Sequence, residues 1–587
     1  MSKLAGIVET ARDVRAGRLS ALALVESRLA RIEALDPSLN CFTEVLADRA
    51  RREAAAVDAL VKAGKDPGPL AGVPFGVKDN YDVAGRVTTA GSIVNRGLAP
   101  AREDAVLIRR LTRAGAVLLG TQNMDEFAYG FTTENHHYGP TRNPLDTARS
   151  AGGSSGGSAA SVAAGMVDFS LGTDTNGSIR VPASFSGVFG LKPTFGRLPR
   201  SGTFPFVHDL DHLGPFARNA ADLTAVYDAI QGHDGDDLAC ADIPPEPALS
   251  SADQPFTGRV GVLGGWFDEL ADDQGRAAVA MTADALGATD RVEFAGVAQA
   301  RAAAFILTCA SGGNLHFDAL AARAEEFDPA TRDRLIAGAL IPAHYVLQAQ
   351  RFRTMFREQV LAAFARYDLL LAPATPCSAP ELGQPTIHVA GEDIPTRANI
   401  GLLTQPLSFI GLPIVAVPVR NGSMPIGVQI IAPPLARGAG AAGGRASRTC
   451  RRRARSRGAA VIVNDPIALA EMEEAFAAYE KALMDNDLDA LDALFWPSPL
   501  TVRIGPGQNL YGIEAIQAFR QNRVGGSPQR ELLKVVITTF GRDFATANCE
   551  FQRAGAPRPG RQSQTWARFS EGWRVVSAHI SMLGEGS

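Results

Sequence analysis

The sequence predicts an α/β fold for a large N-terminal domain, followed by a small α+β domain at the C-terminal end. At 587 residues and 46% hydrophobic content, the chain is too long for one ordinary domain and apolar enough for large cores. Apolar runs alternate with helix-like segments up to residue 434, and the composition then changes abruptly. We expect domains at residues 1–434 and 465–587, joined by a linker at 435–464.

The first 64 residues predict one or more amphipathic helices. Apolar side chains recur at helical spacing between Leu22 and Leu35, interleaved with arginine and glutamate. The segment PSLN at residues 37–40 is expected to end this pattern.

Short apolar runs further along predict the strands of a mixed or largely parallel central sheet. They alternate with helical segments such as residues 104–115, which is typical of a sheet covered by helices. The runs are VPFGV (73–77), AVLLG (116–120), FSLGT (169–173), DLLLAPATP (368–376), PIVAVPV (413–419) and PIGVQII (425–431).

The segment from residue 435 to residue 460 contains eight arginines, no lysine, no acidic residue and almost no large apolar side chain. This composition cannot bury a core and favours a flexible linker. An arginine patch that binds RNA or a membrane is an alternative, although no aromatic residues are interleaved for base stacking. A reading-frame slip in a GC-rich gene is another.

The C-terminal region, residues 465–587, predicts a small α+β cone. A helical pattern at 465–495 precedes four segments in which polar and apolar residues alternate, at 531–540, 543–553, 561–570 and 572–583. Short turns at 541–543 and 570–572 join neighbouring segments as hairpins. The resulting curved antiparallel sheet could wrap around a pocket.

Composition excludes several classes of function. A net charge of -4 gives no basic footprint for nucleic acid, and we find no 18-residue apolar run for a membrane span and no signal peptide. The six cysteines are scattered without spacing for a disulfide framework or a structural metal. We expect a cytoplasmic protein that needs no metal or other cofactor and binds neither nucleic acid nor membrane.

Residues 152–178, GGSSGGSAASVAAGMVDFSLGTDTNGS, place two serine-bearing glycine clusters close together with no histidine between them. A linker would continue into polar residues, and a phosphate-binding loop would need Gly-Lys-Ser/Thr. A serine nucleophile would therefore need a base other than histidine. Lys78, at the end of an apolar strand in VPFGVKDN, could serve if burial made its amine neutral.

Five motifs in order closely resemble the amidase signature family over about residues 5–434. They are VPFGVKDN, GTQNMDEFAYG (120–130), GGSSGGSAASVAAG, GTDTNGSIRVPAS (172–184) and GLKPTFGRLPRSG (190–202). The resemblance implies a Ser-cisSer-Lys triad, with Ser178 as nucleophile, Ser154 as the bridging serine after a cis peptide, and Lys78 as base.

The same resemblance implies supporting roles. An oxyanion hole is expected from the backbone N–H groups of Thr175, Asn176, Gly177 and Ser178. Ser155 is expected to hold the lysine, and Asp174 to orient the turn before the nucleophile. Arg180 has two open interpretations, a grip on a substrate carboxylate or an ion pair that supports the turn. His208 and His212 are either pocket residues or structural ones.

One departure from the family is informative. Asn176 stands where most relatives have glycine, and together with GTFPFVHDLDHLGPFAR (202–218) it resembles the subgroup of 1-carboxybiuret and oxalurate amidohydrolases. That subgroup implies hydrolysis of a small carboxylated amide or ureide with release of ammonia. It also implies a small helical partner protein, and we expect a homo-oligomer.

The C-terminal domain resembles a family of small cones, similar to nuclear transport factor two, that includes a 1,3-dicarboxyurea deamidase. The motifs are AAYEKAL (477–483), LFWPSPLTVRIGPGQNLYG (494–512) and SQTWARF (563–569). By resemblance, Tyr479 and Arg503 form the candidate active pair, with pocket walls from Trp496, Gln564 and Trp566. A core tyrosine and a sheet-edge arginine are the structural alternatives.

Two other functions stay open at this point. The chain could be the glutaminase-type subunit of a tRNA-dependent amidotransferase, which has the same triad but passes ammonia to a partner. Alternatively, it could be an amidase whose C-terminal domain only dimerises.

Overall fold

The computed structural model describes residues 4–249, 256–434, 463–505, 508–523 and 529–582. The chain divides into two compact units, Met1–Gly440 and Ala441–Ser587. The predicted linker lies outside the described residues except for its last two positions. Of these, Val463 bridges to Phe540, and the Asn464 N–H donates to the Thr539 carbonyl at 3.0 Å.

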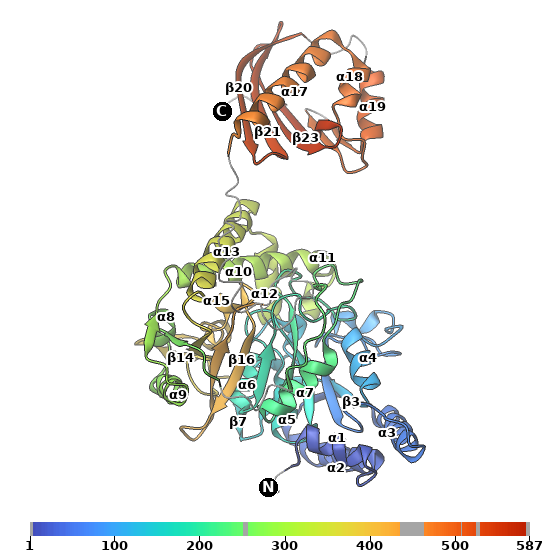
Figure 1. Cartoon of the computed structure of the whole chain (residues 1–587), viewed down its shortest axis with the longest axis vertical. Helices are drawn as coiled ribbons and strands as arrows, with labels where there is room; N and C mark the ends of the chain where they lie inside the picture. Colours follow the sequence, from blue (N-terminus) through green and yellow to red (C-terminus); the bar gives the residue numbers. More distant parts are fainter. Residues whose placement is uncertain (1–3, 250–255, 435–462, 506–507, 524–528, 583–587) are drawn as a thin grey trace. The chain divides into compact units, whose positions relative to one another are not determined.

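Unit 1 is built on one eleven-stranded sheet (Figure 1). Its strands, in spatial order, are β1 (Phe42–Val45), β3 (Val117–Gln122), β2 (Pro74–Lys78), β8 (Phe169–Asp174), β10 (His212–Ala217), β9 (Phe189–Lys192), β16 (Ile414–Val419), β17 (Ile426–Ile431), β13 (Leu369–Pro373), β11 (Val260–Leu263) and β12 (Asp290–Val292). All six runs predicted as strands lie in this sheet, and the sheet is mixed, as expected.

Strand direction brings the ends of two motifs together. β2 is parallel to both of its neighbours, β3 and β8, with Phe75 opposite Phe169 and Val77 opposite Leu171. Phe75 and Phe169 stack with ring centroids 5.2 Å apart, which fixes the register of the two strands. Because parallel strands end at the same edge of a sheet, Lys78 at the end of β2 lies beside the end of β8.

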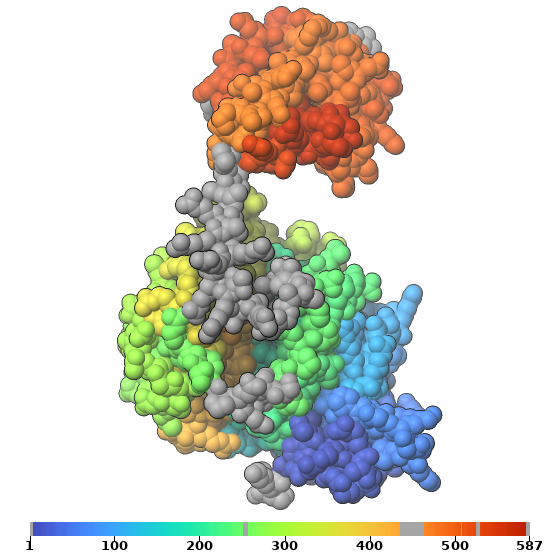
Figure 2. All heavy atoms as spheres, in the orientation of Figure 1, coloured from blue at the N-terminus to red at the C-terminus, as the bar shows by residue number. Residues whose placement is uncertain are grey.

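The predicted N-terminal helices form as α1 (Ile7–Arg15), α2 (Ala21–Leu39) and α3 (Ala47–Lys62), at one end of unit 1 (Figures 1 and 2, blue). α2 does not end before PSLN but continues through Pro37 to Leu39. Leu39 is buried, so its packing favours the last turn despite the proline. The helix then stops at Asn40, which is left-handed with φ of 55°.

Further helices cover the sheet, and α10, α12 and α13 pack against one another. They are α4 (Val106–Arg113), α5 (Gly156–Ala163), α6 (Arg180–Ser186), α7 (Ala220–Ile230), α8 (Trp266–Glu269), α9 (Asp273–Ala285), α10 (Val297–Leu315), α11 (Phe317–Arg323), α12 (Pro329–Ala339), α13 (Ala343–Ala363), α14 (Thr396–Asn399) and α15 (Gln405–Ser408). In the part of the chain that the structure describes, no helix is long and apolar enough to cross a membrane.

Unit 2 is an α+β domain with a six-stranded sheet in the order β19-β18-β23-β22-β21-β20. Its elements are α17 (Pro466–Asp485), α18 (Leu488–Ala493), β18 (Val502–Gly505), β19 (Gln508–Tyr511), α19 (Ile513–Gln521), β20 (Arg530–Phe540), β21 (Phe544–Arg553), β22 (Gly560–Phe569) and β23 (Gly572–Met582). The four predicted strands and both hairpins form. The sequence did not predict the two short strands β18 and β19, and β18 pairs in parallel with β23.

Candidate active site

Lys78 and Ser154 are in direct contact. The Lys78 side chain is fully buried, and its Nζ donates to Ser154 Oγ at 2.7 Å and to Thr173 Oγ1 at 2.8 Å. Thr173 is the penultimate residue of β8, so the parallel register of β2 and β8 creates the second contact.

The surroundings of Lys78 favour a neutral amine. Burial lowers the pKa of Lys78 to about 7, although the carboxylates of Asp125, Asp211 and Asp174 act in the opposite direction. A lysine with this pKa is partly neutral near pH 7 and can accept a proton, as the sequence reasoning required.

Ser155 does not contact the lysine as expected. Its hydroxyl donates to the Thr173 carbonyl at 3.2 Å and accepts from the Thr173 N–H at 3.3 Å. Ser155 therefore holds the backbone of the residue whose hydroxyl contacts Lys78. The peptide bond between Gly153 and Ser154 is cis, as the family resemblance implied.

Ser178 lies in the turn between β8 and α6 and is almost fully buried. The Ser155 N–H donates to the Ser178 carbonyl at 3.3 Å, which joins the turn to the loop that carries Ser154. Both side chains are described, and no hydrogen bond links their hydroxyls. Gly177 has φ of 139°, and a Cβ there would lie 2.1 Å from Thr404 Oγ1, so the residue before Ser178 must be glycine.

Part of the predicted oxyanion hole is already occupied. The Gly177 N–H donates to Asp174 Oδ1 at 2.7 Å, so it is not available to an oxyanion in this structure. The N–H groups of Thr175, Asn176 and Ser178 have no partner among the described residues. Three of the four predicted donors therefore remain.

Arg180 supports the turn from inside the protein. It pairs with Asp174 at 2.9 Å, and both side chains are fully buried. The remaining guanidinium donors reach Gln429 Oε1 at 2.6 Å, the Thr404 carbonyl at 3.2 Å and Ser408. Although burial alone would raise it, the Arg180 charge holds the pKa of Asp174 well below its usual range. The interpretation of Arg180 as a substrate-binding cation does not fit these contacts.

A narrow cavity of about 20 Å³ adjoins Ser178, and sequence reasoning did not predict its other walls. Arg334 of α12 is half-buried there, with its guanidinium 3.9 Å from the centroid of the Tyr129 ring. It donates to two backbone carbonyls and has no acidic partner among the described residues. Thr308 of α10 and Gln405 of α15 also line this cavity. No local motif marks these residues, since three separate helices supply them.

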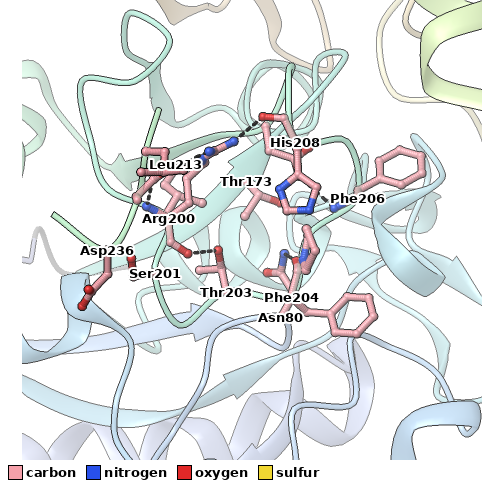
Figure 3. A pocket seen from close by; sticks show the side chains of 14 residues that line it. Asn80, Thr173, Arg200, Ser201, Thr203, Phe204, Phe206, His208, Leu213 and Asp236 are labelled. Carbon is pink, nitrogen blue, oxygen red and sulfur yellow. Dashed lines mark hydrogen bonds and ion pairs between the residues drawn. The ribbon is translucent and has the colours of Figure 1, made fainter. Parts of the chain in front are cut away.

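A larger cavity of about 330 Å³ lies on the other side of the lysine contact (Figure 3). Thr173 and Phe206 line it, and Figure 3 shows His208 and Phe204 beside them. His212 does not line it. This histidine is buried, and its Nδ1 donates to the Leu210 carbonyl at 2.6 Å, so its role is structural.

In unit 2, Tyr479 and Arg503 line the same cavity of about 50 Å³. Burial raises the pKa of Tyr479 and lowers the pKa of Arg503. The Tyr479 hydroxyl accepts from Gln562 Nε2 at 3.1 Å. The predicted pair is therefore close together in the fold.

The other predicted pocket walls are wrong. Trp566 is fully buried behind Tyr479 and donates to Gln564 at 3.3 Å, while Trp496 stacks on Phe569. Instead, the cavity is lined by Gln562 and five arginines: Arg503, Arg520, Arg523, Arg530 and Arg553.

Two of these arginines are neutralised by nearby acids. Arg520 pairs with Asp492, and Arg530 pairs with Glu480. The guanidinium groups of Arg503, Arg523 and Arg553 have no acidic partner in the described part of the chain. The cavity therefore carries an excess of positive charge.

Known proteins match both units. Residues 23–437 match the family described as Amidase, and residues 461–586 match the family described as AtzH-like. AtzE, a 1-carboxybiuret hydrolase subunit from Pseudomonas sp. (strain ADP), is 53% identical over 431 residues, which cover 73% of this chain and 94% of that protein. The chain belongs to the amidase signature family. It is an amide hydrolase with an AtzH-like domain at its C-terminal end.

Solved structures agree with this membership. One described as "An unexpected vestigial protein complex reveals the evolutionary origins of an s-triazine catabolic enzyme" has a TM-score of 0.73 and 52% identity, covering 74% of this chain and 96% of that chain. A bacterial aryl acylamidase has a TM-score of 0.68 and 28% identity over 74% and 93% of the two chains. A glutamyl-tRNA(Gln) amidotransferase subunit from Synechococcus sp. (strain RCC307) is 38% identical over 454 residues, which cover 72% of this chain and 92% of that protein.

Proposed function

We propose that unit 1 hydrolyses a C–N bond of a small carboxylated urea, such as 1-carboxybiuret, and releases ammonia through a triad of Ser178, Ser154 and Lys78. The observation that carries this proposal is the buried contact between Lys78 and Ser154, with the pKa of the lysine lowered to about 7. A base of this strength can deprotonate a serine through a hydroxyl relay near neutral pH.

In the first half of the reaction, Ser178 Oγ forms a bond to the scissile carbonyl carbon. Its proton moves to Ser154, and the Ser154 proton moves to the lone pair of the neutral Lys78. The negative charge on the carbonyl oxygen is stabilised by the free N–H groups of the turn before Ser178.

In the second half, the C–N bond breaks, and the proton held on Lys78 returns through Ser154 to the leaving nitrogen, which departs as ammonia. Water then attacks the ester carbon and loses its proton by the same route. The bond to Ser178 breaks, which releases the acid product and regenerates the serine.

Arg334 supports a carboxylated substrate. It is the cation beside Ser178 without an acidic partner among the described residues, and a guanidinium suits a planar carboxylate. The 53% identical relative carries 1-carboxybiuret hydrolase in its name, which favours the same substrate class here.

Ammonia release from 1-carboxybiuret, oxalurate and a plain aryl amide tests this function. We expect the carboxylated ureides to be preferred and Ser178→Ala to abolish release from all three. Arg334→Gln should raise KM for the ureides and leave the aryl amide unchanged, because that substrate has no carboxylate. Hydrolysis of the aryl amide alone by the unaltered enzyme would contradict the proposed substrate.

The amidotransferase alternative rests on relatives such as the 38% identical Synechococcus protein. It predicts that ammonia release requires a partner and ATP. A small helical partner could still be needed for the hydrolase, so each assay should be run with and without such a protein.

For unit 2, we propose a second deamidation of a small dicarboxylated urea, with Tyr479 as proton donor and Arg503 gripping a carboxylate. The excess positive charge of the cavity favours a substrate with two negative charges. Tyr479→Phe and Arg503→Ala should each remove this second activity and leave the first one intact. If both variants keep both activities and the oligomeric state is unchanged, unit 2 is a dimerising module instead.

A further inference from the structure

The cavity beside Ser178 contains two amide side chains whose orientations are fixed by neighbours behind them. They are Asn176, in the turn before the nucleophile, and Gln405, at the start of α15. An amide offers an acceptor at one end and donors at the other. The neighbour that occupies one end therefore determines which end is left for a substrate.

Asn176 presents its oxygen. Its Nδ2 lies 2.9 Å from Thr308 Oγ1, and the single proton of that hydroxyl is donated to the Ala304 carbonyl at 2.8 Å. Thr308 can therefore only accept from Asn176, and the nitrogen must face it. Asn176 Oδ1 is left buried and without a partner among the described residues, in a side chain that is 6% exposed.

Gln405 presents the opposite end. Its Oε1 accepts from Arg301 Nε at 3.2 Å, and a guanidinium has no acceptor to offer. The Nε2 group of Gln405 therefore faces away from Arg301 and has no partner in the described structure. The cavity thus offers one fixed acceptor and one fixed donor near the nucleophile.

We propose that Asn176 is a specificity-determining residue that accepts a hydrogen bond from a substrate N–H beside the scissile carbonyl, while Gln405 donates to a substrate oxygen. The pair selects a urea-type N–H next to C=O over an amide with methylene at the same position. This inference rests on the proposed hydrolysis of a carboxylated urea by unit 1 and adds the group that the pocket recognises.

The physical reason is the cost of an unpaired buried acceptor. A substrate N–H satisfies Asn176 Oδ1, whereas a methylene of the same size leaves it unpaired and without water. A site built to hydrogen-bond a polar group rejects an isostere that lacks the group more strongly than an apolar site rejects one that gains it.

Binding to the Ser178→Ala protein tests the inference without turnover. Hydantoate and succinamate are stable carboxylates that differ only by N–H in place of methylene beside the amide carbon. We expect calorimetric titration to show hydantoate binding about tenfold more tightly.

Variants of the amide and its anchor assign the preference to Asn176. In the Ser178→Ala background, Asn176→Gly should remove most of the tenfold preference by weakening hydantoate binding. Thr308→Val should also reduce it, because the amide loses the acceptor that orients it. Thr308→Ser retains the hydroxyl and is expected to retain the preference, which separates orientation from a general change in packing.

Biuret and malonamide, the same exchange without a carboxylate, distinguish failure of this inference from failure of the proposed function. Equal affinities for hydantoate and succinamate, or a preference that survives Asn176→Gly, would overturn the inference alone. Carboxylated and neutral probes that bind equally well would contradict the carboxylate site. If none of the four probes binds, both the ureide site and this inference are overturned.

Discussion

The chemistry of the amidase unit depends most on the state of one side chain, the amine of Lys78. A lysine in water is almost fully charged at pH 7, and a charged amine cannot accept a proton. Here the apolar strand around Lys78 removes it from water, and two hydroxyl groups replace its hydration. The fold thus favours the neutral base while the side chain remains hydrogen-bonded.

The pH dependence of activity should follow this amine. Below a pH of about 7, Lys78 is charged and inactive as a base, so kcat/KM should rise as pH increases through about 7 and then level off. A pH profile of ammonia release measures the midpoint. A profile that stays flat between about pH 6 and 8 would mean that Lys78 is not the base in the step observed.

Thr173 should tune the same amine. Thr173→Val removes one of its two hydrogen-bond acceptors, so we expect kcat to fall about tenfold with little change in KM. Thr173→Ser, which keeps the hydroxyl, is the matched control. Equal losses in both variants would point to packing in place of the hydrogen bond.

Motifs in the sequence predicted the triad residues, because glycine-rich turns and a strand-end lysine leave a local pattern. They did not predict Arg334, Thr308 or Gln405. Each of these lies on a different helix, more than 100 residues from Ser178, and an arginine or threonine on a helix is usually unremarkable. Only the packing of those helices over the nucleophile gives them a function.

At the scale of elements, the turn between β8 and α6 is held from both ends. Asp174, the last residue of β8, accepts from two N–H groups of the turn, those of Gly177 and Ile179. Arg180, the first residue of α6, neutralises that carboxylate. Strand, turn and helix are thereby tied into one rigid segment around Ser178.

Breaking this pair should be costly for stability. Arg180→Ala leaves a buried carboxylate without its cation, which typically destabilises a protein by about 3–5 kcal/mol. Urea denaturation measures the change. As a control, Arg12→Ala removes an exposed ion pair and should change the free energy of unfolding by less than about 1 kcal/mol.

The elements themselves were predictable where the pattern was long. The four long strands of unit 2 alternate polar and apolar residues over ten or eleven positions. β18 and β19 have only four residues each and lie in a segment rich in glycine and proline, so periodicity cannot mark them. Their sheet partner, β23, lies far along the chain, and only the folded structure brings them together.

At the scale of the whole molecule, the two units have separate hydrophobic cores. Phe75, Phe169 and the strands around them belong to unit 1, while Trp566, Tyr479 and Val575 form the centre of unit 2. Separate cores predict separate unfolding transitions.

Scanning calorimetry of single-residue variants tests this separation. Phe75→Ala should lower the transition temperature of one unit only, and Trp566→Ala that of the other, since each large-to-small change creates a cavity in one core. Both transitions moving together in either variant would show that the units unfold as one.

The contact between Arg180 and Gln429 has a consequence for how the enzyme is made. All five signature motifs have left the ribosome once residue 202 is synthesised, yet a buried partner of the nucleophile's turn is contributed by β17, more than 200 residues later. Until then, the guanidinium lacks an acceptor inside the protein. An incomplete chain that ends before β17 therefore contains every catalytic serine and lysine but should be inactive.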